Sequence, residues 1–536
     1  MHDSTGYGPC ATRRHLRLTS RRSWAVALGV VVVTLMGCGT TVPLAGRSAA
    51  SGAAGAQPGL ASAGAAQVGG GSAQPDGGAG GGSSGSSTGP TPASQTSPIG
   101  GTANQAQASV AGGGGVPSSG FGWDAKHVYV GVPTADDFNQ VVKQAGANFN
   151  NGDVHGDVDA IVADINRAGG ILGRQVVVAY RDASTADYSS NPSVVAQSMC
   201  AYFTQDRPVV AVINGFPQLD AQPNFHTCLE QRAVTLLSLT NTVYNNQDYV
   251  HLGPHLFSAA SLSTDLLIPP FVSALSRQGF FSGWDTTLGG PASTPAKVGL
   301  LLPDDASGHY VGGLLKAQLK ASGQQVASEF YYPPSGSGSQ SQAEVLNFAS
   351  AKVTHVLDLP PVELEVALFQ RQAEDQHYRP RYGITSFDLP LTVEENSAVA
   401  PPVQQIGSIG IGWQPLNDTS TPKDVGDMPG GKRCFAALKA GGQTFNGSTR
   451  RAAFAGALVC DAFYLLRDAM VGGKGFTGAD ILQAMPTVGP TFTPAGTFGS
   501  VLSGNDHGVP GYYRDLQYQA ACSCFAYLGG NRPLSR

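Results

Sequence analysis

Three residues in the middle of the chain have side chains suited to proton transfer. Asp304, Asp305 and His309 stand within six positions of one another, and a carboxylate beside an imidazole is a common acid–base pairing. Catalysis would also require pKa values displaced from their ordinary range at a bound substrate. The stretch 303–310 carries the Asp and Ser residues that begin helices. We therefore assign the three residues to a helix start and predict that the chain is not an enzyme.

Signatures of metal and phosphate chemistry are missing from the sequence. It contains no H-E-x-x-H pair for zinc, and Gly472-Gly473-Lys474 lacks the Ser or Thr that completes a phosphate-binding loop. Cys522 and Cys524 form a Cys-x-Cys pair, but no His or second cysteine pair lies at metal-ligand spacing. We expect no metal site and no cofactor.

A second group of polar and aromatic residues follows the ends of the predicted strands. In open parallel sheets, small ligands bind beyond the carboxyl ends of the strands. Hydroxyl, amide and carboxylate groups gathered there would orient a small polar molecule. The candidate ligand-binding residues are Thr134, Asn214, Gly215, Phe216, Ser238, Thr240, Tyr310, Ser386 and Asp388. Two of them, Ser238 and Asp388, could instead cap turns.

The elements that position these residues begin with one strand–helix–strand unit. Gly169 is suited to the left-handed cap that ends a helix. The run 176–180 is continuously apolar and predicts a strand buried on both faces of a parallel sheet. With an earlier strand at 128–132, the unit is a βαβ crossover. The predicted buried face of its helix, at helical spacing, consists of Val158, Ile161, Val162 and Ile165.

The same alternation continues along the chain in two series, which predict an α/β fold with two Rossmann-like lobes. Further strands are expected at 208–213, 233–237, 297–302, 354–359, 382–386 and 406–411. Helices are expected near 191–204, 219–231, 308–321 and 362–375. Lobe 1 would comprise about 126–257 and 415–508, and lobe 2 about 258–414 and 509–536.

The first crossover and a late helix carry a family resemblance. Ile165-Asn166-x-Ala168-Gly169-Gly170-Ile171-x-Gly173-Arg174 resembles the first crossover of type I periplasmic binding proteins, and 460–466 resembles their penultimate long helix. Within that family the chain is most similar to the branched-chain amino acid (Leu/Ile/Val) substrate-binding lipoproteins of ABC transporters. The resemblance implies two lobes that are joined by a hinge and close on a small ligand. It also implies a membrane permease and an ATPase as partners.

The same resemblance suggests roles for individual residues. In the family's amino acid receptors, hydroxyl and backbone N–H groups of lobe 1 hold the ligand carboxylate, and an acidic group and aromatic side chains of lobe 2 hold the ammonium. By resemblance, Ser238 and Thr240 would serve the carboxylate and Asp388 the ammonium. The chain departs from the family at Gly215-Phe216-Pro217, where serines are usual, and at Pro360-Pro361, where an aromatic residue is common. An amino acid, an amide, a peptide-like molecule and another small polar metabolite all stay open as ligands.

The N-terminal segment has the pattern of an export signal. An arginine-rich stretch precedes an uncharged run at 24–36 that is too short to span a bilayer comfortably. Leu35-Met36-Gly37-Cys38 resembles the lipobox of bacterial lipoproteins, whose cysteine is acylated after cleavage just before it. We predict a signal peptide at 1–37, a lipid anchor on Cys38 and a disordered Gly/Ser/Ala/Pro tether at 38–120. The folded part, 121–536, would then lie outside the cytoplasm in the bacterial cell envelope, exported by either the general or the twin-arginine route.

An even number of cysteines in the folded part predicts disulfides, although fifteen pairings are possible. These cysteines are Cys200, Cys228, Cys434, Cys460, Cys522 and Cys524. Right-handed crossovers place the second and third helices on one face of the first sheet, which favours pairing of the first two. The next two lie on consecutive helices of one lobe, and the last two would remain as a tight pair.

The composition excludes one class of partner. A net charge of -5 with 13% charged residues gives no basis for binding nucleic acid. The expected function is capture of a small polar ligand for an ABC importer. The alternative is a ligand-sensing or surface lipoprotein of the same fold without a transport role, because a fold does not determine a function.

Overall fold

The computed structural model describes residues 116–144, 150–333, 340–359, 363–397, 400–420, 428–445, 450–502 and 506–534. The predicted signal peptide, Cys38, the tether up to residue 115 and the pair Pro360-Pro361 lie outside these ranges. Within them, no helix combines the length and apolarity that a bilayer crossing requires.

Lobe 1 contains a parallel sheet with the strand order β2-β1-β3-β4-β5. Its strands are β1 His127–Thr134, β2 Gln175–Asp182, β3 Ala211–Asn214, β4 Thr235–Ser238 and β5 Leu256–Ser258. β2 is an edge strand, and Val177 on one of its faces is 37% exposed. The expectation that this strand is buried on both faces is therefore wrong, because its position at the edge leaves one face incompletely covered.

Lobe 2 contains a mixed sheet with the strand order β14-β13-β12-β11-β10-β8-β9. Strands β8 to β12 pair in parallel, whereas β13 and β14 form an antiparallel hairpin beside β12. The strands are β8 Val298–Pro303, β9 Val326–Tyr332, β10 His355–Asp358, β11 Arg381–Ile384, β12 Ile409–Gly412, β13 Tyr512–Gln519 and β14 Cys524–Pro533. A separate two-stranded ribbon consists of β6 Trp284–Asp285 and β7 Gly290–Pro291.

Helices accompany both sheets. In lobe 1 they are α2 Phe138–Gln144, α3 Val154–Arg167, α4 Thr185–Ser190, α5 Pro192–Ala201, α6 Pro217–Asp220, α7 Pro223–Glu230, α8 Asn246–Leu252, α16 Gly431–Ala440, α17 Arg450–Gly473 and α18 Gly478–Val488. In lobe 2 they are α9 Thr264–Arg277, α10 Ala306–Ala321, α11 Ser341–Ser350, α12 Glu363–Asp375 and α13 Pro390–Glu395, and α14 Pro415–Asp418 follows β12. Single turns are Tyr202–Asp206, Ser386–Asp388, Pro402–Gln405 and Gly489–Thr491.

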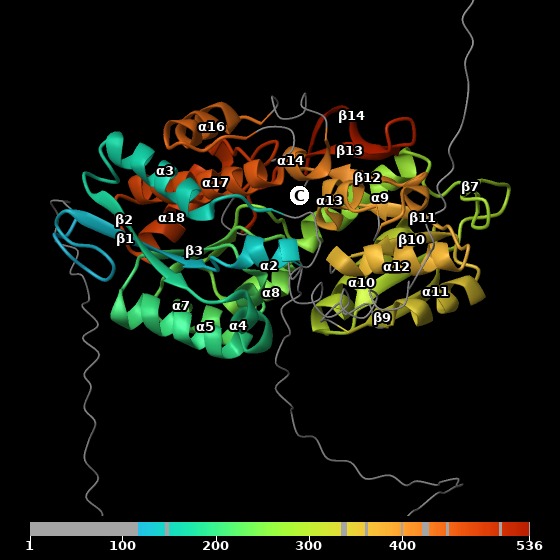
Figure 1. Cartoon of the computed structure of the whole chain (residues 1–536), viewed down its shortest axis with the longest axis horizontal. Coiled ribbons are helices and arrows are strands. Elements are labelled where there is room, and N and C mark those ends of the chain that lie inside the picture. The colour runs from blue at the N-terminus through green and yellow to red at the C-terminus, as the bar shows by residue number, and fades with distance from the viewer. Residues whose placement is uncertain are drawn as a thin grey trace, which may run out of the picture. The chain divides into compact units, whose positions relative to one another are not determined.

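The chain passes between the two sheets three times. It leaves the first sheet after β5, returns after β12, and crosses again before β13. As a result, late helices complete the first lobe: α16 and α17 pack against α3, and Figure 1 shows the orange and red α16–α18 beside the blue-green β1–β3.

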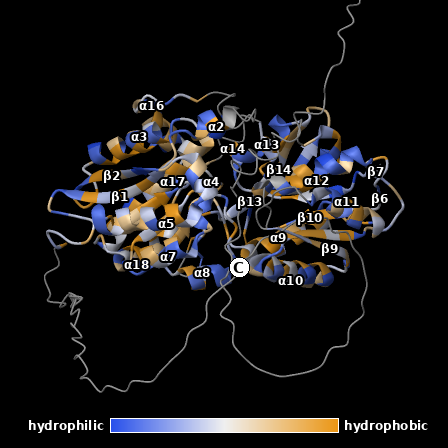
Figure 2. Ribbon diagram, turned by 60° about the horizontal axis from the view of Figure 1, so that its bottom comes forward, coloured by the Kyte–Doolittle hydropathy of each residue, from blue (hydrophilic) through white to orange (hydrophobic). Residues whose placement is uncertain are grey.

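Helix α3 follows the predicted pattern closely. Its four apolar positions are at most 9% exposed, and Asp153 caps its start by accepting a hydrogen bond from the backbone N–H of Gly156. The helix ends at a glycine pair in which Gly169 has φ +102° and Gly170 has φ +75°. Both values lie in the left-handed region that glycine adopts without a Cβ clash. Figure 2 shows hydrophobic residues along the strands of both lobes and along the helix faces that cover them.

The helix expected near 219–231 is two helices in the structure. α6 ends at Asp220, and α7 begins at Pro223. Proline has no N–H to donate and its ring clashes with the preceding turn, so it starts a helix more readily than it continues one. The break places Asp220 at the end of α6.

The structure joins the six cysteines as Cys200–Cys228, Cys434–Cys460 and Cys522–Cys524. These are the pairs that the topology favours. The last pair joins Cys522, in the turn after β13, to Cys524, the first residue of β14, with only Ser523 between them.

We expect the three disulfides to differ in their contribution to stability. A cross-link stabilises by restricting the unfolded chain, and the effect grows with the length of the closed loop. Cys434–Cys460, at a sequence separation of 26, should contribute about 3.5 kcal/mol. Cys522–Cys524, at a separation of 2, should contribute about 1.5 kcal/mol. Thermal unfolding of the two double Cys→Ser variants measures the difference, and equal losses of stability would contradict this prediction.

Candidate ligand-binding site

A cavity of about 410 Å³ lies at the carboxyl ends of β1 and β3 in lobe 1. Three of the predicted residues, Thr134, Gly215 and Phe216, line it. A smaller cavity of about 80 Å³ adjoins it, shares Gly215 as a wall and is lined by Thr240 and Arg451. The larger volume is in the range of small-molecule sites. Both cavities lie at strand ends of lobe 1, where a ligand could be held.

Much of the larger cavity is apolar. Phe138 and Phe216 contribute aromatic rings, and Val132, Leu239 and Val459 contribute aliphatic side chains. The ring of Phe216 stacks on Tyr188 with 4.5 Å between ring centroids and an interplanar angle of 9°. Tyr188 is 2% exposed, so a buried ring supports Phe216 from behind. This wall suits the flat or apolar body of a ligand.

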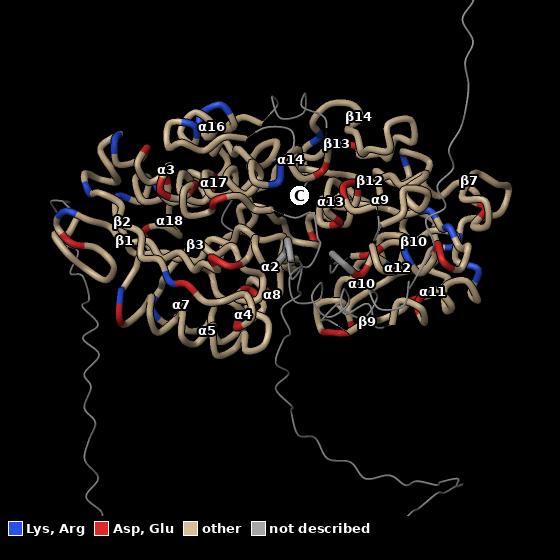
Figure 3. Tube along the Cα trace, viewed as in Figure 1, with Lys and Arg blue, Asp and Glu red and all other residues tan. Residues whose placement is uncertain are grey.

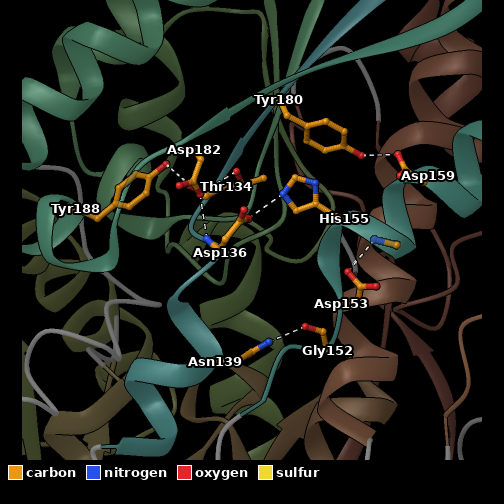
Figure 4. Close-up of polar contacts among 11 residues, drawn as sticks. Thr134, Asp136, Asn139, Gly152, Asp153, His155, Asp159, Tyr180, Asp182 and Tyr188 are labelled. Carbon is orange, nitrogen blue, oxygen red and sulfur yellow. Dashed lines mark hydrogen bonds and ion pairs between the residues drawn. The ribbon is translucent and has the colours of Figure 1, made fainter.

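The cavity lining includes two carboxylates, Asp136 and Asp153, beside the imidazole of His155 and several uncharged polar groups. Figure 3 shows acidic segments of the chain in red and basic ones in blue. Asp182 Oδ1 accepts hydrogen bonds from the Thr134 hydroxyl, at 3.2 Å, and from the backbone N–H of Asp136, at 3.0 Å. His155 Nε2 lies 2.9 Å from Asp136 Oδ1, and the His155 ring packs on Tyr180 with 4.3 Å between centroids. Figure 4 shows this chain of contacts from β2 through the β1 loop to the start of α3.

The sequence prediction includes Thr134 but omits the acid–imidazole pair of Asp136 and His155. A usable signal was present, because the first turn of a helix in a βαβ unit lies at the same sheet edge as the end of the preceding strand. Residues 153–155 begin α3 and therefore belong to that edge.

Asn214, Ser238 and Thr240 are brought together, but around a buried carboxylate. Asp220 Oδ2 accepts hydrogen bonds from the hydroxyls of Ser238 and Thr240, both at 2.6 Å. Asp220 Oδ1 accepts one from Asn214 Nδ2 at 2.8 Å. Ser238 and Asn214 are 0% exposed and do not line the larger cavity, whereas Thr240 borders the smaller one. Asp220, which sequence reasoning missed, organises this side of the site.

Asn214 connects that buried carboxylate to the cavity wall. Its Nδ2 also donates to the Phe216 carbonyl at 2.9 Å, and its Oδ1 accepts from the Phe216 backbone N–H at 3.0 Å. The loop through Gly215 and Phe216 is therefore clamped from both sides by one amide. Burial raises the pKa of Asp220, while the neighbouring His226 and the hydrogen bonds that Asp220 accepts act in the opposite direction.

The three predicted residues of lobe 2 are placed at its strand ends but bond within that lobe or to the crossing segment. Tyr310 donates its hydroxyl to Asp265 Oδ1 at 2.7 Å. Ser386 donates to Asp418 Oδ2 at 2.7 Å. Asp388 Oδ2 accepts from the backbone N–H and the hydroxyl of Thr385, at 2.6 and 3.0 Å, and so closes the turn Ser386–Asp388. None of the three lines either of the two lobe 1 cavities.

We expect Asp388 to make stability depend on pH. Burial raises the pKa of Asp388 to about 7, above the value of about 3.9 in an unfolded chain. Between these values the folded state binds more protons than the unfolded state, so stability falls as the pH rises. Asp388→Asn removes the ionisable group and with it this loss of stability. The free energy of unfolding of the variant, minus that of the unsubstituted protein, should therefore rise by up to about 1.4 kcal/mol per pH unit between about pH 5 and pH 7.

Denaturant unfolding across this pH range measures the effect. Asp206→Asn, at an exposed position of lobe 1, is the matched control and should follow the unsubstituted protein. Parallel pH profiles for all three proteins would contradict the prediction.

The group Asp304, Asp305 and His309 forms a helix start. Asp305 caps α10 by accepting from the backbone N–H of Gly308 at 2.7 Å. His309 Nε2 lies 3.0 Å from Asp304 Oδ1, and both side chains are more than half exposed. These residues do not line the cavities described above.

The fold and this site define a binding protein with two Rossmann-like lobes. The family model described as "Periplasmic binding protein" matches residues 145–519. The chain therefore belongs to the periplasmic binding protein family and has its type I fold.

Solved structures support the same fold at low sequence identity. A solute binding protein of an ABC transporter from Rhodopseudomonas palustris HaA2, in complex with p-hydroxybenzoic acid, has a TM-score of 0.53 and 12% identity, covering 77% of this chain and 98% of that one. An ABC transporter substrate binding protein from Aeropyrum pernix has a TM-score of 0.55 and 14% identity, covering 76% and 96%. A branched chain amino acid ABC transporter protein from Thermus thermophilus, with bound valine, has a TM-score of 0.52 and 14% identity, also covering 76% and 96%. The search of curated proteins gave no match.

Proposed function

We propose that the chain is an extracytoplasmic solute-binding lipoprotein that captures a small ligand between its two lobes for an ABC importer. The observation that carries this proposal is the lobe 1 cavity of about 410 Å³ at the ends of β1 and β3. This is where open α/β sheets bind ligands. The family membership supports a binding role, and the helix-start role of Asp304, Asp305 and His309 gives no support to catalysis.

Lobe 2 would supply the opposite wall when the lobes close. Tyr310, Ser386 and Asp388 follow β8 and β11, the strands whose carboxyl ends would form that wall. Gln414, in the segment that crosses after β12, donates from Nε2 to Asn241 Oδ1 of lobe 1 and to the Ala260 carbonyl of another crossing segment, both at 2.8 Å. Asn241 borders the smaller cavity, so this amide contact lies beside the site.

We also propose where the protein is located and which partners it has. A signal peptide at 1–37, a lipid on Cys38 and a tether at 38–120 would hold the folded part near the outer face of the membrane. There a permease and an ATPase would receive the ligand. The proposal involves no cofactor and no nucleic acid.

A thermal-shift screen of the mature protein against amino acids, amides, amines and aromatic acids tests the binding role. A ligand that binds only the folded state stabilises it by mass action, by about 2.7 kcal/mol at a hundred times its Kd. We expect at least one class of small molecule to raise the melting temperature with a saturable dose dependence. A broad panel in which no compound does so would contradict the proposal.

A further inference from the structure

We propose that the ligand held in the lobe 1 cavity is an organic cation, an amine or amidine on an apolar or aromatic body, and that lobe 1 does not hold a ligand carboxylate. This inference rests on the proposed solute-binding function and specifies its ligand class. Family resemblance suggests that lobe 1 holds the negatively charged carboxylate of a ligand, whereas this inference places a positively charged group there.

The first observation is the charge of the cavity lining. Asp136 and Asp153 contribute carboxylates and His155 contributes an imidazole. Among the described lining residues of both cavities, Arg451 is the sole Lys or Arg, and it borders the smaller cavity. Its Nη1 already donates to Thr392 Oγ1 at 2.8 Å and to Asn417 Oδ1 at 3.3 Å. An anion in the larger cavity would face two carboxylates, whereas a cation would be attracted to them.

The second observation concerns the hydroxyls that would have to grip a carboxylate. Ser238 and Thr240 each have one hydroxyl proton, and both hydroxyls lie 2.6 Å from Asp220 Oδ2. Thr242 Oγ1, at 2.7 Å, is a second buried acceptor for Thr240. Their oxygens accept backbone N–H groups in return: Ser238 Oγ from Thr240 at 3.2 Å, and Thr240 Oγ1 from Thr242 at 3.1 Å. A hydroxyl can donate only once. Binding a ligand carboxylate would therefore require these buried hydrogen bonds to break.

The third observation is that the rim carboxylates are held in place. The backbone N–H of Asp136 is bound to Asp182, and the Asp136 side chain is positioned by His155. Asp136 remains 64% exposed, so it is accessible to a ligand. The ring of Phe216, which stacks on Tyr188, lines the same cavity. Aromatic faces attract ammonium groups as well as apolar bodies.

Lobe 2 is acidic at the corresponding strand ends. Asp358 ends β10 and Asp388 follows β11, and they are 2% and 3% exposed. One carboxyl oxygen of each, Oδ2 of Asp358 and Oδ1 of Asp388, is buried without a hydrogen-bond partner among the described residues. A buried acceptor without a donor is costly. Burial raises the pKa of both carboxyl groups, so a cation brought between the lobes would favour their charged forms.

The test is isothermal titration of the mature protein with probes that share one body and differ in charge. The aromatic set consists of phenethylamine, phenylacetate, phenylalanine and phenethyl alcohol. The aliphatic set consists of butylamine, butyrate, valine and butanol. We expect an amine to bind at least tenfold more tightly than its matched acid and amino acid. Asp136→Asn should weaken amine binding about tenfold or more and leave the alcohol nearly unaffected. Asp206→Asn, at an exposed position outside both cavities, is the control of equal charge change.

The outcomes separate this inference from the proposed function. If the acids or amino acids bind more tightly than the amines, and Arg451→Gln abolishes that binding, the inference of a cationic ligand is wrong. The solute-binding role would remain supported. Equal binding of amine and alcohol would also overturn it. If no probe of any charge binds, the result counts against both proposals.

Discussion

Replacing Asp220 with alanine is expected to destabilise lobe 1 by about 3–5 kcal/mol. The carboxylate accepts three hydrogen bonds of 2.6 to 2.8 Å from Ser238, Thr240 and Asn214. Asp220 is 0% exposed, so water does not replace it in the folded protein. Each donor left without an acceptor in a buried place costs about 1–3 kcal/mol, and the alanine also leaves a small void.

The same substitution should weaken ligand binding by more than the loss of stability alone explains. Asp220 orients Asn214, and Asn214 clamps both polar atoms of the Phe216 backbone. Without that clamp, Phe216 loses the fixed position that it needs as a cavity wall. Asp220 is therefore a positioning residue, since it is buried and does not line the cavity.

Thermal and urea unfolding of the Asp220→Ala variant measures the first effect, and titration below its melting temperature measures the second. Asp206→Ala is the control at an exposed position in the same lobe. A loss of stability of less than about 1 kcal/mol would contradict the role given to Asp220, because an ordinary surface substitution can cost as much.

Replacing Gly215 with tryptophan is expected to abolish ligand binding, by at least about a hundredfold, while preserving the fold. Gly215 lines both cavities, and no atom lies within 4 Å of the position that a Cβ would occupy there. The new side chain can therefore project into the space that the ligand would fill. Gly215 also has no positive φ value, so a larger residue carries no backbone strain.

Gly313→Trp is the matched control for this prediction. Gly313 lies at an exposed position of α10 in lobe 2, and there too no atom comes within 4 Å of the place where a Cβ would stand. The melting temperature and the affinity of this control should both stay close to those of the unsubstituted protein. If Gly215→Trp binds as tightly as the control, the ligand does not occupy the lobe 1 cavity.

The regular parts of the fold follow from local patterns. The helical spacing of Val158, Ile161 and Ile165 predicts the buried face of α3, and the glycine pair at 169–170 predicts its end. Short strands whose pairing depends on distant segments are harder to foresee. β5, β9 and the β13–β14 hairpin are absent from the sequence predictions, because their residues are less continuously apolar or lie beyond long connections.

The site shows the same division. Strand ends can be predicted from topology, and so Thr134, Gly215 and Phe216 are placed at the cavity. The direction of each side chain cannot be predicted from topology, because neighbouring residues of a strand point to opposite faces. This is why Ser238, expected to meet the ligand, instead bonds to a carboxylate that lies 18 residues earlier. Pro223 separates α6 from α7 and so leaves Asp220 at a helix end that the sequence prediction places inside one helix.

The most direct test of the account is an experimental structure of the mature protein with the small molecule that binds it. We predict that the molecule contacts Gly215, Phe216 and Asp136 at the ends of β1 and β3, with Asp388 approaching from lobe 2. A ligand bound elsewhere on the molecule, with this cavity filled only by water, would contradict the central claim.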